Sequence, residues 1–352
     1  MGHRAAALIL SLFLSLAGVR CGSDRISPGT MAQIRQAHAR MLTVDGCISS
    51  EGSASIISRM KAGGLDAAFF VVSVPQGEPT PEGYAAGRGE ALDAIRRIRR
   101  IVGERPRLIS LALTPEDAYL LEKEGRHAAY FGLENGYALG ADLSLVSEYY
   151  KEGVRYLALC GDSDNAICDS AFGRSGPEDG GLSDFGRRVV AECDRLGMIV
   201  DVAGCSERSF FDVLDASLAP VIVSHTAARA LCGRPENLTD EMIGAVAKRG
   251  GVVMVSFEPE RLVARDRASR AATADIADHI QHIVKIAGID CVGIGSGFGN
   301  GGGVFGLRDT GEILNLTLEL LKRGYGEHDI ESIWGGNAMR VFKEAEARAG
   351  ER

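Results

Sequence analysis

Short apolar runs alternate with longer amphipathic stretches along most of the chain. From residue 41 onward, eight runs rich in Val, Ile, Leu and Ala each end in Gly or polar residues. Such runs are typical of strands buried on both faces of a parallel sheet. They cover residues 41–46, 65–74, 127–134, 155–161, 197–204, 219–225, 250–258 and 290–297. A ninth run, residues 107–113, is predicted to be an edge strand or an excursion from the main sheet.

Helical patterns separate these runs. The clearest cover residues 90–102, 184–196, 240–249 and 275–287, and Thr239 offers an N-cap before the third of them. Eight strand–helix repeats predict an α/β fold, a (β/α)8 barrel of the TIM type. An open doubly wound sheet is the alternative, and the regular count favours the barrel. No Pro/Ser-rich linker divides the chain, so we expect residues 23–352 to form a single domain.

The first 22 residues have the pattern of a signal peptide. Arg4 precedes an apolar run over residues 5–17, and a short, mostly small and polar stretch follows it. A run of this length is too short to cross a bilayer, and an ordinary buried helix is the alternative. Cys21 is a candidate for lipid attachment, although Arg20 is a poor neighbour for that processing. We therefore expect an exported protein, periplasmic, extracellular or membrane-anchored, that contacts a membrane only through a lipid.

Charge and cysteine content narrow the class of protein. The formal charge is −8, from 39 basic and 47 acidic residues, and no basic stripe is present. This argues against a nucleic-acid partner. Eight cysteines without a CxxC pair do not form a disulfide framework in so long a chain. One or two bridges remain open, and the spacing does not say which cysteines would form them.

In a barrel the functional residues lie at the carboxyl ends of the strands. Polar or small residues follow the predicted strands at Asp45, Cys47, Ser49, Glu134, Asp201, Cys205, His225, Glu258 and Gly297. Of the seven histidines only His225 is well placed there. His279 and His282 are three apart in a predicted helix, and we expect them on a solvated or partly buried face. Glu134 would be costly to bury alone, so a salt bridge with an arginine and a metal-ligand role both remain open.

Several long segments of the chain resemble the membrane, or renal, dipeptidase family of zinc hydrolases. They cover residues 132–159, 181–206, 219–257, 278–296 and 324–342, and the likeness extends from about residue 31 to 343. The resemblance implies a (β/α)8 barrel, export and frequent homodimers. It also implies cleavage of dipeptides by two zinc ions that a glutamate and a hydroxide bridge.

The catalytic positions are where the chain departs from this resemblance. Glu134 matches the bridging glutamate and His225 matches a ligand histidine, but Cys47 and Ser49 replace the ligands of the first strand. Four further positions lose the family's residue: the carbonyl-contacting His falls on Gly161, a ligand His on Gly204, the substrate-gripping Arg on Glu236 and the proton-handling Asp on Gly297. Two remaining ligands cannot hold two zinc ions, each of which needs about four.

The sequence therefore predicts a dipeptidase-like barrel with a degenerate zinc site. The leading hypothesis is a non-catalytic protein that binds a small peptide-like or anionic ligand, or a partner subunit. The alternative is an active dipeptidase or metallohydrolase in which Cys47, Glu134 and His225 hold a single zinc ion, so we expect at most one zinc. A less favoured hypothesis makes Cys47 a nucleophile with His225 as its base.

A glycine-rich loop follows the last predicted strand. Gly297 and Gly299 in this loop, with Asn237, are candidates for binding the substrate or an anion. The alternative is that small residues fill the space left by missing side chains.

Overall fold

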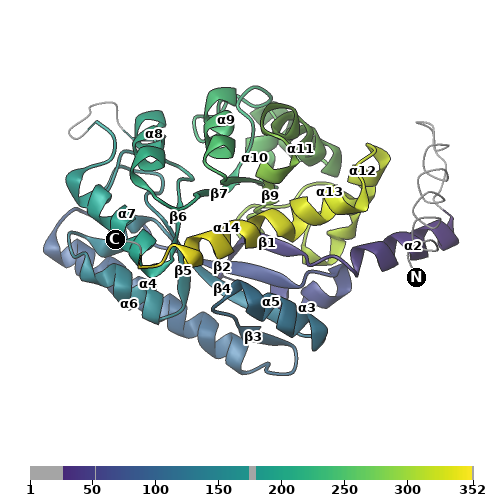
Figure 1. Cartoon of the computed structure of the whole chain (residues 1–352), viewed down its shortest axis with the longest axis horizontal. Helices are drawn as coiled ribbons and strands as arrows, with labels where there is room; N and C mark the ends of the chain where they lie inside the picture. The colour runs from purple at the N-terminus through teal and green to yellow at the C-terminus, as the bar shows by residue number, and fades with distance from the viewer. Residues whose placement is uncertain (1–26, 52, 174–179, 351–352) are drawn as a thin grey trace.

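The chain folds into a parallel β-barrel surrounded by helices (Figure 1). The structure is a computed structural model and describes residues 27–51, 53–173 and 180–350. The strands are β1 (Val44–Ser49), β2 (Ala67–Ser73), β3 (Ile109–Leu111), β4 (His127–Glu134), β5 (Val154–Ala158), β6 (Ile199–Asp201), β7 (Ile222–Thr226), β8 (Val252–Val255) and β9 (Val292–Ile294). They pair in the order β1-β2-β4-β5-β6-β7-β8-β9, and all the pairs are parallel.

The ring closes between β9 and β1 just beyond the last residues of β9. Ile48 and Phe298 form a parallel bridge there. Ser49 N donates a hydrogen bond to Phe298 O at 2.9 Å, and Gly297 N donates one to Cys47 O at 2.8 Å. Strand β3 pairs only with β4 and lies outside the ring. The predicted barrel and the predicted excursion at residues 107–113 are both confirmed.

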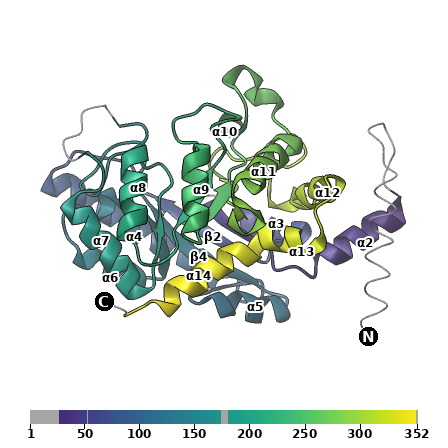
Figure 2. The same cartoon turned by 45° about the horizontal axis from the view of Figure 1, so that its top comes forward.

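Helices follow the strands around the outside of the barrel, as α6, α7, α8 and α9 show (Figure 2). The helices are α2 (Pro28–His38), α3 (Ser53–Gly63), α4 (Pro81–Gly103), α5 (Pro115–Lys123), α6 (Ser144–Lys151), α7 (Asp184–Leu196), α8 (Glu207–Ala216), α9 (Asp240–Lys248), α10 (Pro259–Leu262), α11 (Thr273–Ala287), α12 (Leu314–Lys322), α13 (Glu327–Glu331) and α14 (Asn337–Ala347). The four predicted helices are confirmed as α4, α7, α9 and α11. As expected, the Thr239 hydroxyl caps α9 by accepting from Met242 N at 3.2 Å.

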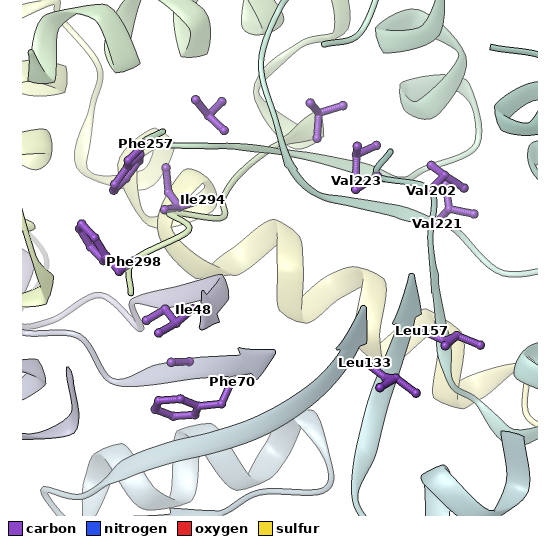
Figure 3. Close-up of a cluster of buried hydrophobic side chains, with 14 of the residues drawn as sticks. Ile48, Phe70, Leu133, Leu157, Val202, Val221, Val223, Phe257, Ile294 and Phe298 are labelled. Carbon is purple, nitrogen blue, oxygen red and sulfur yellow. The ribbon is translucent and has the colours of Figure 1, made fainter. Parts of the chain in front are cut away.

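The apolar core consists of two clusters, one on each face of the strands. The larger cluster lies between strands and helices, and Figure 3 shows side chains that β2, β4, β5 and β7 contribute to it, among them Phe70, Leu133, Leu157 and Val223. The smaller cluster fills the barrel interior. Side chains alternate along a strand, so Tyr130 lies on the same interior face of β4 as Glu134.

An aromatic layer closes the interior at the end opposite the carboxyl ends of the strands. Phe69 stacks on Tyr130 with ring centroids 4.8 Å apart, and Phe342 of α14 meets Tyr130 edge-on at 5.5 Å. Tyr156 adds a fourth ring, 5.4 Å from Phe69. Since this end is filled, a ligand can reach the interior only from the carboxyl-terminal end, which we call the barrel mouth.

The predicted signal peptide, residues 1–22 including Cys21, lies outside the described residues. Within the described part of the chain, no helix is long and apolar enough to cross a membrane. Export and lipid attachment therefore stay predictions.

Candidate functional site

Glu134 and His225, the two residues that match family ligands, meet at the barrel mouth. Glu134 ends β4 and His225 lies near the end of β7. His225 Nε2 is 3.6 Å from Glu134 Oε1, and the other ring nitrogen, Nδ1, is 2.8 Å from the Ser224 hydroxyl. The two side chains are 12% and 24% exposed, so solvent reaches the pair. The structure thus brings together two of the residues that the strand-end rule selected, the two that match family ligands.

Two buried aspartates each link neighbouring strands at the mouth by accepting hydrogen bonds from main-chain N–H groups. Asp45 Oδ1 accepts hydrogen bonds from Cys47 N at 3.1 Å and from Ser296 N at 2.9 Å, which links β1 to the segment after β9. Asp201 Oδ1 accepts from Ala203 N and Ser224 N, both at 2.9 Å, which links β6 to β7. These carboxylates replace main-chain acceptors, so the strands can end here without unpaired N–H groups.

Burial keeps a share of these carboxyl groups protonated near neutral pH. It raises the pKa of Asp45 to about 7, against hydrogen bonds from Ser296 and Cys47 that favour the ionised form. It also raises the pKa of Asp201 to about 6, although the nearby His225 and the Ser224 hydrogen bonds lower it. Sequence reasoning placed both residues at strand ends but did not foresee their structural role.

Cys47 lies among these carboxylates as a buried thiol. It is 7% exposed, and burial, followed by the negative charges of Glu134 and Asp45, raises its pKa well above the usual range. A protonated thiol is a poor nucleophile and a poor metal ligand. The buried, negatively charged environment of Cys47 therefore argues against the hypothesis that Cys47 attacks a substrate with His225 as its base.

The donor set does not fit a pair of zinc ions. Ser49 accepts a hydrogen bond from Glu51 N at 3.1 Å, and Gly161 and Gly204 have no donor side chain. Among the described residues, one group of three His, Cys, Asp or Glu ligand atoms lies mutually within 4.8 Å, and it consists of Cys160, Cys168 and Cys205. Cys47, Glu134 and His225 do not form such a group. Their joint role as ligands of a single zinc stays a prediction.

A carboxylate occupies the space beside Gly297, where the family has an aspartate. A Cβ atom at Gly297 would lie 2.9 Å from Glu258 Oε1. Arg261, at the following turn of α10, holds this carboxylate, with 2.7 Å between its Nε and Glu258 Oε2. Arg261 also approaches Glu236 at 3.9 Å, which in turn pairs with Arg234 at 3.1 Å.

Arg261 is therefore a partly buried cation at the mouth that the sequence analysis did not single out. Burial lowers the pKa of its guanidinium, but the charges of Glu258, Glu236 and Glu134 outweigh burial and raise that pKa above its ordinary value. The i, i+3 spacing of Glu258 and Arg261 across a short helix was the available sequence signal. The charge reversal at Glu236 is thus balanced by an arginine from a different segment.

The three candidates for substrate or anion binding are engaged in the fold. Asn237 is fully buried, and its amide donates to Cys232 O and Arg261 O, both at 2.8 Å. Gly297 N donates to Cys47 O, so that N–H does not face a ligand. Gly297 and Gly299 both have positive φ, +71° and +87°, which explains glycine at these turns. Anion binding by these residues stays a prediction that these contacts do not favour.

The helical histidines differ in part from expectation. His282 is partly buried and lies 2.7 Å from Asp240 Oδ1, as a residue on a partly solvated face would. His279 instead is 1% exposed, with Nδ1 accepting from Ala228 N at 3.0 Å and Nε2 2.9 Å from Leu262 O. The prediction of a solvated or partly buried face was wrong for His279, because the loop after β7 and helix α10 cover that side of α11.

A cavity of about 920 Å³ opens at the carboxyl ends of β1 and β2. Ser49, Ser73 and the first residue of α3, Ser53, line it together with Glu90 and Arg97 of α4. The Ser53 hydroxyl is buried without a hydrogen-bond partner. Ser73, which lines this cavity, pairs in register with Glu134 on β4, although neither Glu134 nor His225 lines the cavity.

Comparison with known proteins agrees with this architecture. The chain is 33% identical over 298 residues to dipeptidase tcpJ of Claviceps purpurea, covering 82% of this chain and 69% of that protein. It is 34% identical over 313 residues to dipeptidase ataJ of Aspergillus terreus, covering 82% and 76%. The crystal structure of the probable dipeptidase PvdM from Pseudomonas aeruginosa superposes with a TM-score of 0.85 at 28% identity, covering 92% of this chain and all of that one.

The family profile described as membrane dipeptidase (peptidase family M19) matches residues 28–351. This range includes every strand of the barrel and both residues of the Glu134–His225 pair. The chain therefore belongs to the membrane dipeptidase family of metallopeptidases.

Proposed function

We propose that this protein is a non-catalytic member of the dipeptidase family that binds a small peptide-like ligand at the barrel mouth. The observation that supports this most directly is the isolation of the Glu134–His225 pair. The two side chains lie 3.6 Å apart, and no third ligand atom among the described residues groups with them. Without a bound metal ion the pair has no Lewis acid to polarise a peptide bond and no means to generate a hydroxide.

The charges at the mouth suit a ligand that carries an ammonium group. Glu134 and Glu258 present carboxylates there, and both influence the pKa of the nearby Cys47 thiol. Arg261 already pairs with Glu258, and the ion pair that Glu134 forms among the described residues is with His225. The amino group of a peptide would complete this site.

The adjoining cavity suits the opposite end of such a ligand. The amino terminus of α3, an 11-residue helix, lies at its wall, and helix amino termini favour anions. The unpartnered Ser53 hydroxyl and the Arg97 guanidinium line the same cavity. Glu51, Glu90 and Asp93 also line the cavity, so the carboxylate of a dipeptide would lie at the α3 amino terminus, beside Ser53 and Arg97.

The alternative proposal is a hydrolase that uses one zinc ion held by Cys47, Glu134 and His225. The carboxylates of Glu134, Asp45, Glu258 and Asp201 surround Cys47, and a bound cation would offset the rise in the thiol pKa that they cause. This alternative requires the three donor atoms to move within coordination distance of one ion.

Zinc content and dipeptide turnover distinguish the two proposals. We would measure both in zinc-replete protein for the wild type and for Glu134→Gln, His225→Gln and Cys47→Ala, with the buried Cys232→Ala as control. We expect no dipeptide turnover in any of these proteins. We also expect the zinc content of the three variants to equal that of the wild type. Two zinc ions with turnover lost in Glu134→Gln would overturn the proposal. One zinc ion lost in Cys47→Ala together with turnover would establish the alternative.

Ligand binding is tested separately by calorimetric titration with a panel of unmodified dipeptides. Ser53→Ala should weaken binding roughly tenfold, the effect of a hydrogen bond to a charged group. Ser55→Ala, exposed on the same helix, should have no effect. Absence of binding by every dipeptide would contradict the ligand proposal.

We also propose, from the amino-terminal pattern and the family, that the protein is exported and forms homodimers. Cell fractionation of the full chain tests export, and light scattering tests the dimer. A full-length protein that stays in the cytoplasm, or a monomer without a co-purifying relative, would contradict these proposals.

A further inference from the structure

Three cysteines from separate segments converge beyond the ends of β5 and β6. Cys160 follows β5, Cys205 follows β6, and Cys168 belongs to the loop between β5 and α7. Cys160 Sγ lies 3.7 Å from Cys205 Sγ, and Cys168 Sγ lies 3.9 Å from it. All three sulfur atoms lie within 4.8 Å of one another, and the residues are 1%, 1% and 5% exposed. We call this group the trithiol cluster.

Main-chain contacts hold the loop that carries Cys168 against the end of β6. Ala171 N donates to Gly204 O at 2.7 Å, and Ser206 N donates to Asp169 O at 2.9 Å. Antiparallel bridges at Cys168–Leu182 and Ser170–Cys205 add to this attachment. The sulfur atoms are therefore positioned by the backbone around them, which is what a preformed metal site requires.

We propose that the trithiol cluster binds a single Cu(I) ion through three sulfur ligands. Thiolates are soft ligands that select Cu(I), zinc and Fe–S clusters among the biological metals. An ion about 2.3 Å from each of three sulfurs in a plane, the usual metal–thiolate distance, requires the sulfurs to be about 4.0 Å apart. The separations of 3.7 and 3.9 Å come close to this value.

The number of ligands favours Cu(I) over zinc. A structural zinc site uses four protein ligands. The group contains three, and neither His nor a carboxylate joins it among the described residues. A further polar contact of the cluster is to the Asp169 main-chain oxygen, 3.9 Å from Cys160 Sγ.

Binding of Cu(I) exchanges protons for the metal ion. The three thiols release their protons to solvent as their sulfur atoms bind the ion. Three thiolates and one Cu(I) ion have a net charge of −2. The copper enters and remains as Cu(I), so no change of oxidation state is involved.

The proposal is tested on the full chain, purified and kept anaerobic with its cysteines reduced. Cu(I) is titrated in competition with a chromogenic chelator, and X-ray absorption at the copper edge reports the ligands. We expect one Cu(I) per chain with three sulfur neighbours near 2.3 Å. Cys168→Ser should lower the affinity at least tenfold, whereas Cys291→Ser, a buried cysteine outside the cluster, should leave it unchanged.

The spectrum of the wild-type protein tests the proposal even where a variant fails to fold. Nitrogen or oxygen neighbours at copper would place the ion elsewhere and overturn the proposal. Tighter binding of zinc than of Cu(I) by the same three residues would also overturn it. So would an intact mass two units lower, with a disulfide among these three cysteines, in protein purified without reductant. None of these outcomes depends on the Glu134–His225 pair, so this test is independent of the proposed function.

Discussion

The carboxylate of Glu258 lies in close contact with the place where a side chain at Gly297 would begin. A Cβ atom built on Gly297 would be 2.9 Å from Glu258 Oε1, and Gly297 has a φ of +71°. Arg261 fixes the carboxylate in this position. The resemblance to the family places a proton-handling acid at position 297. Here Glu258, from the end of the neighbouring strand, lies beside that position instead and forms an ion pair with Arg261.

Restoring an aspartate at position 297 should therefore destabilise the protein. Positive φ alone costs a residue with a side chain about 1–2 kcal/mol, and Gly297→Asp also meets Glu258 at close range. The matched control is Gly301→Asp, since Gly301 has a φ of +87° but no atom near its absent Cβ. Urea unfolding should show a larger loss for Gly297→Asp than for the control. Equal losses in the free energy of unfolding would mean that the Glu258 side chain moves aside at little cost, and would contradict the prediction.

Removing Arg261 should leave the partly buried carboxylate of Glu258 without its paired cation and Glu236 with Arg234 alone. Arg261 is 13% exposed and pairs with Glu258 and Glu236, the latter 3% exposed. Breaking a buried pair costs about 3–5 kcal/mol, so we expect a loss of this order in the free energy of unfolding for Arg261→Ala. Arg234→Ala removes a more exposed partner of Glu236 and should cost about 1 kcal/mol or less. A reversed order in chemical denaturation would contradict the assignment.

Asp66 should make stability depend on pH in the acid range. Burial raises its pKa to about 6, although the N–H and hydroxyl of Thr43 lower it. An unfolded aspartate has a pKa of about 4, so the folded state binds the proton more tightly between these values. The stability that Asp66 contributes is full below pH 4 and is lost as pH rises through 6.

The measurement compares unfolding free energies of the wild type and Asp66→Asn from pH 4 to 7. From pH 4 to 7 the unfolding free energy of the wild type should fall by roughly 1–3 kcal/mol relative to that of Asp66→Asn, because the pKa of Asp66 differs by one to two units between the folded and the unfolded state. Asp45 and Asp201 titrate in both proteins, so their effects cancel in the difference. A difference that does not change with pH would refute the role assigned to Asp66.

Phe342 should be the most costly single truncation in the aromatic layer that closes the barrel. It is fully buried and contacts both Phe69 and Tyr130. Phe342→Ala should lower the free energy of unfolding by about 3–5 kcal/mol, the usual cost of such a cavity. Phe305→Ala, at a residue 79% exposed, should change it by less than about 0.5 kcal/mol. Thermal and urea unfolding of both variants provide the test.

Part of the site could be predicted from the sequence alone because of a general property of barrels. Parallel strands end on the same side, so residues that follow strands must converge whatever their neighbours are. This argument placed Glu134, His225 and Glu258 at one mouth, and the structure agrees. It could not supply Arg261, which lies one turn into a short helix and whose partners come from two separate segments.

The sequence by itself determined the barrel and the positions of its strands and of four of its helices. These follow from local periodicity. Only the tertiary structure decided which side chains share a site. The meeting of Cys160, Cys168 and Cys205, the carboxylate beside Gly297 and the burial of Asn237 all depend on loops packing against distant strand ends. Such contacts are set by the path of the chain in space, for which the spacing of residues along the sequence carries no signal.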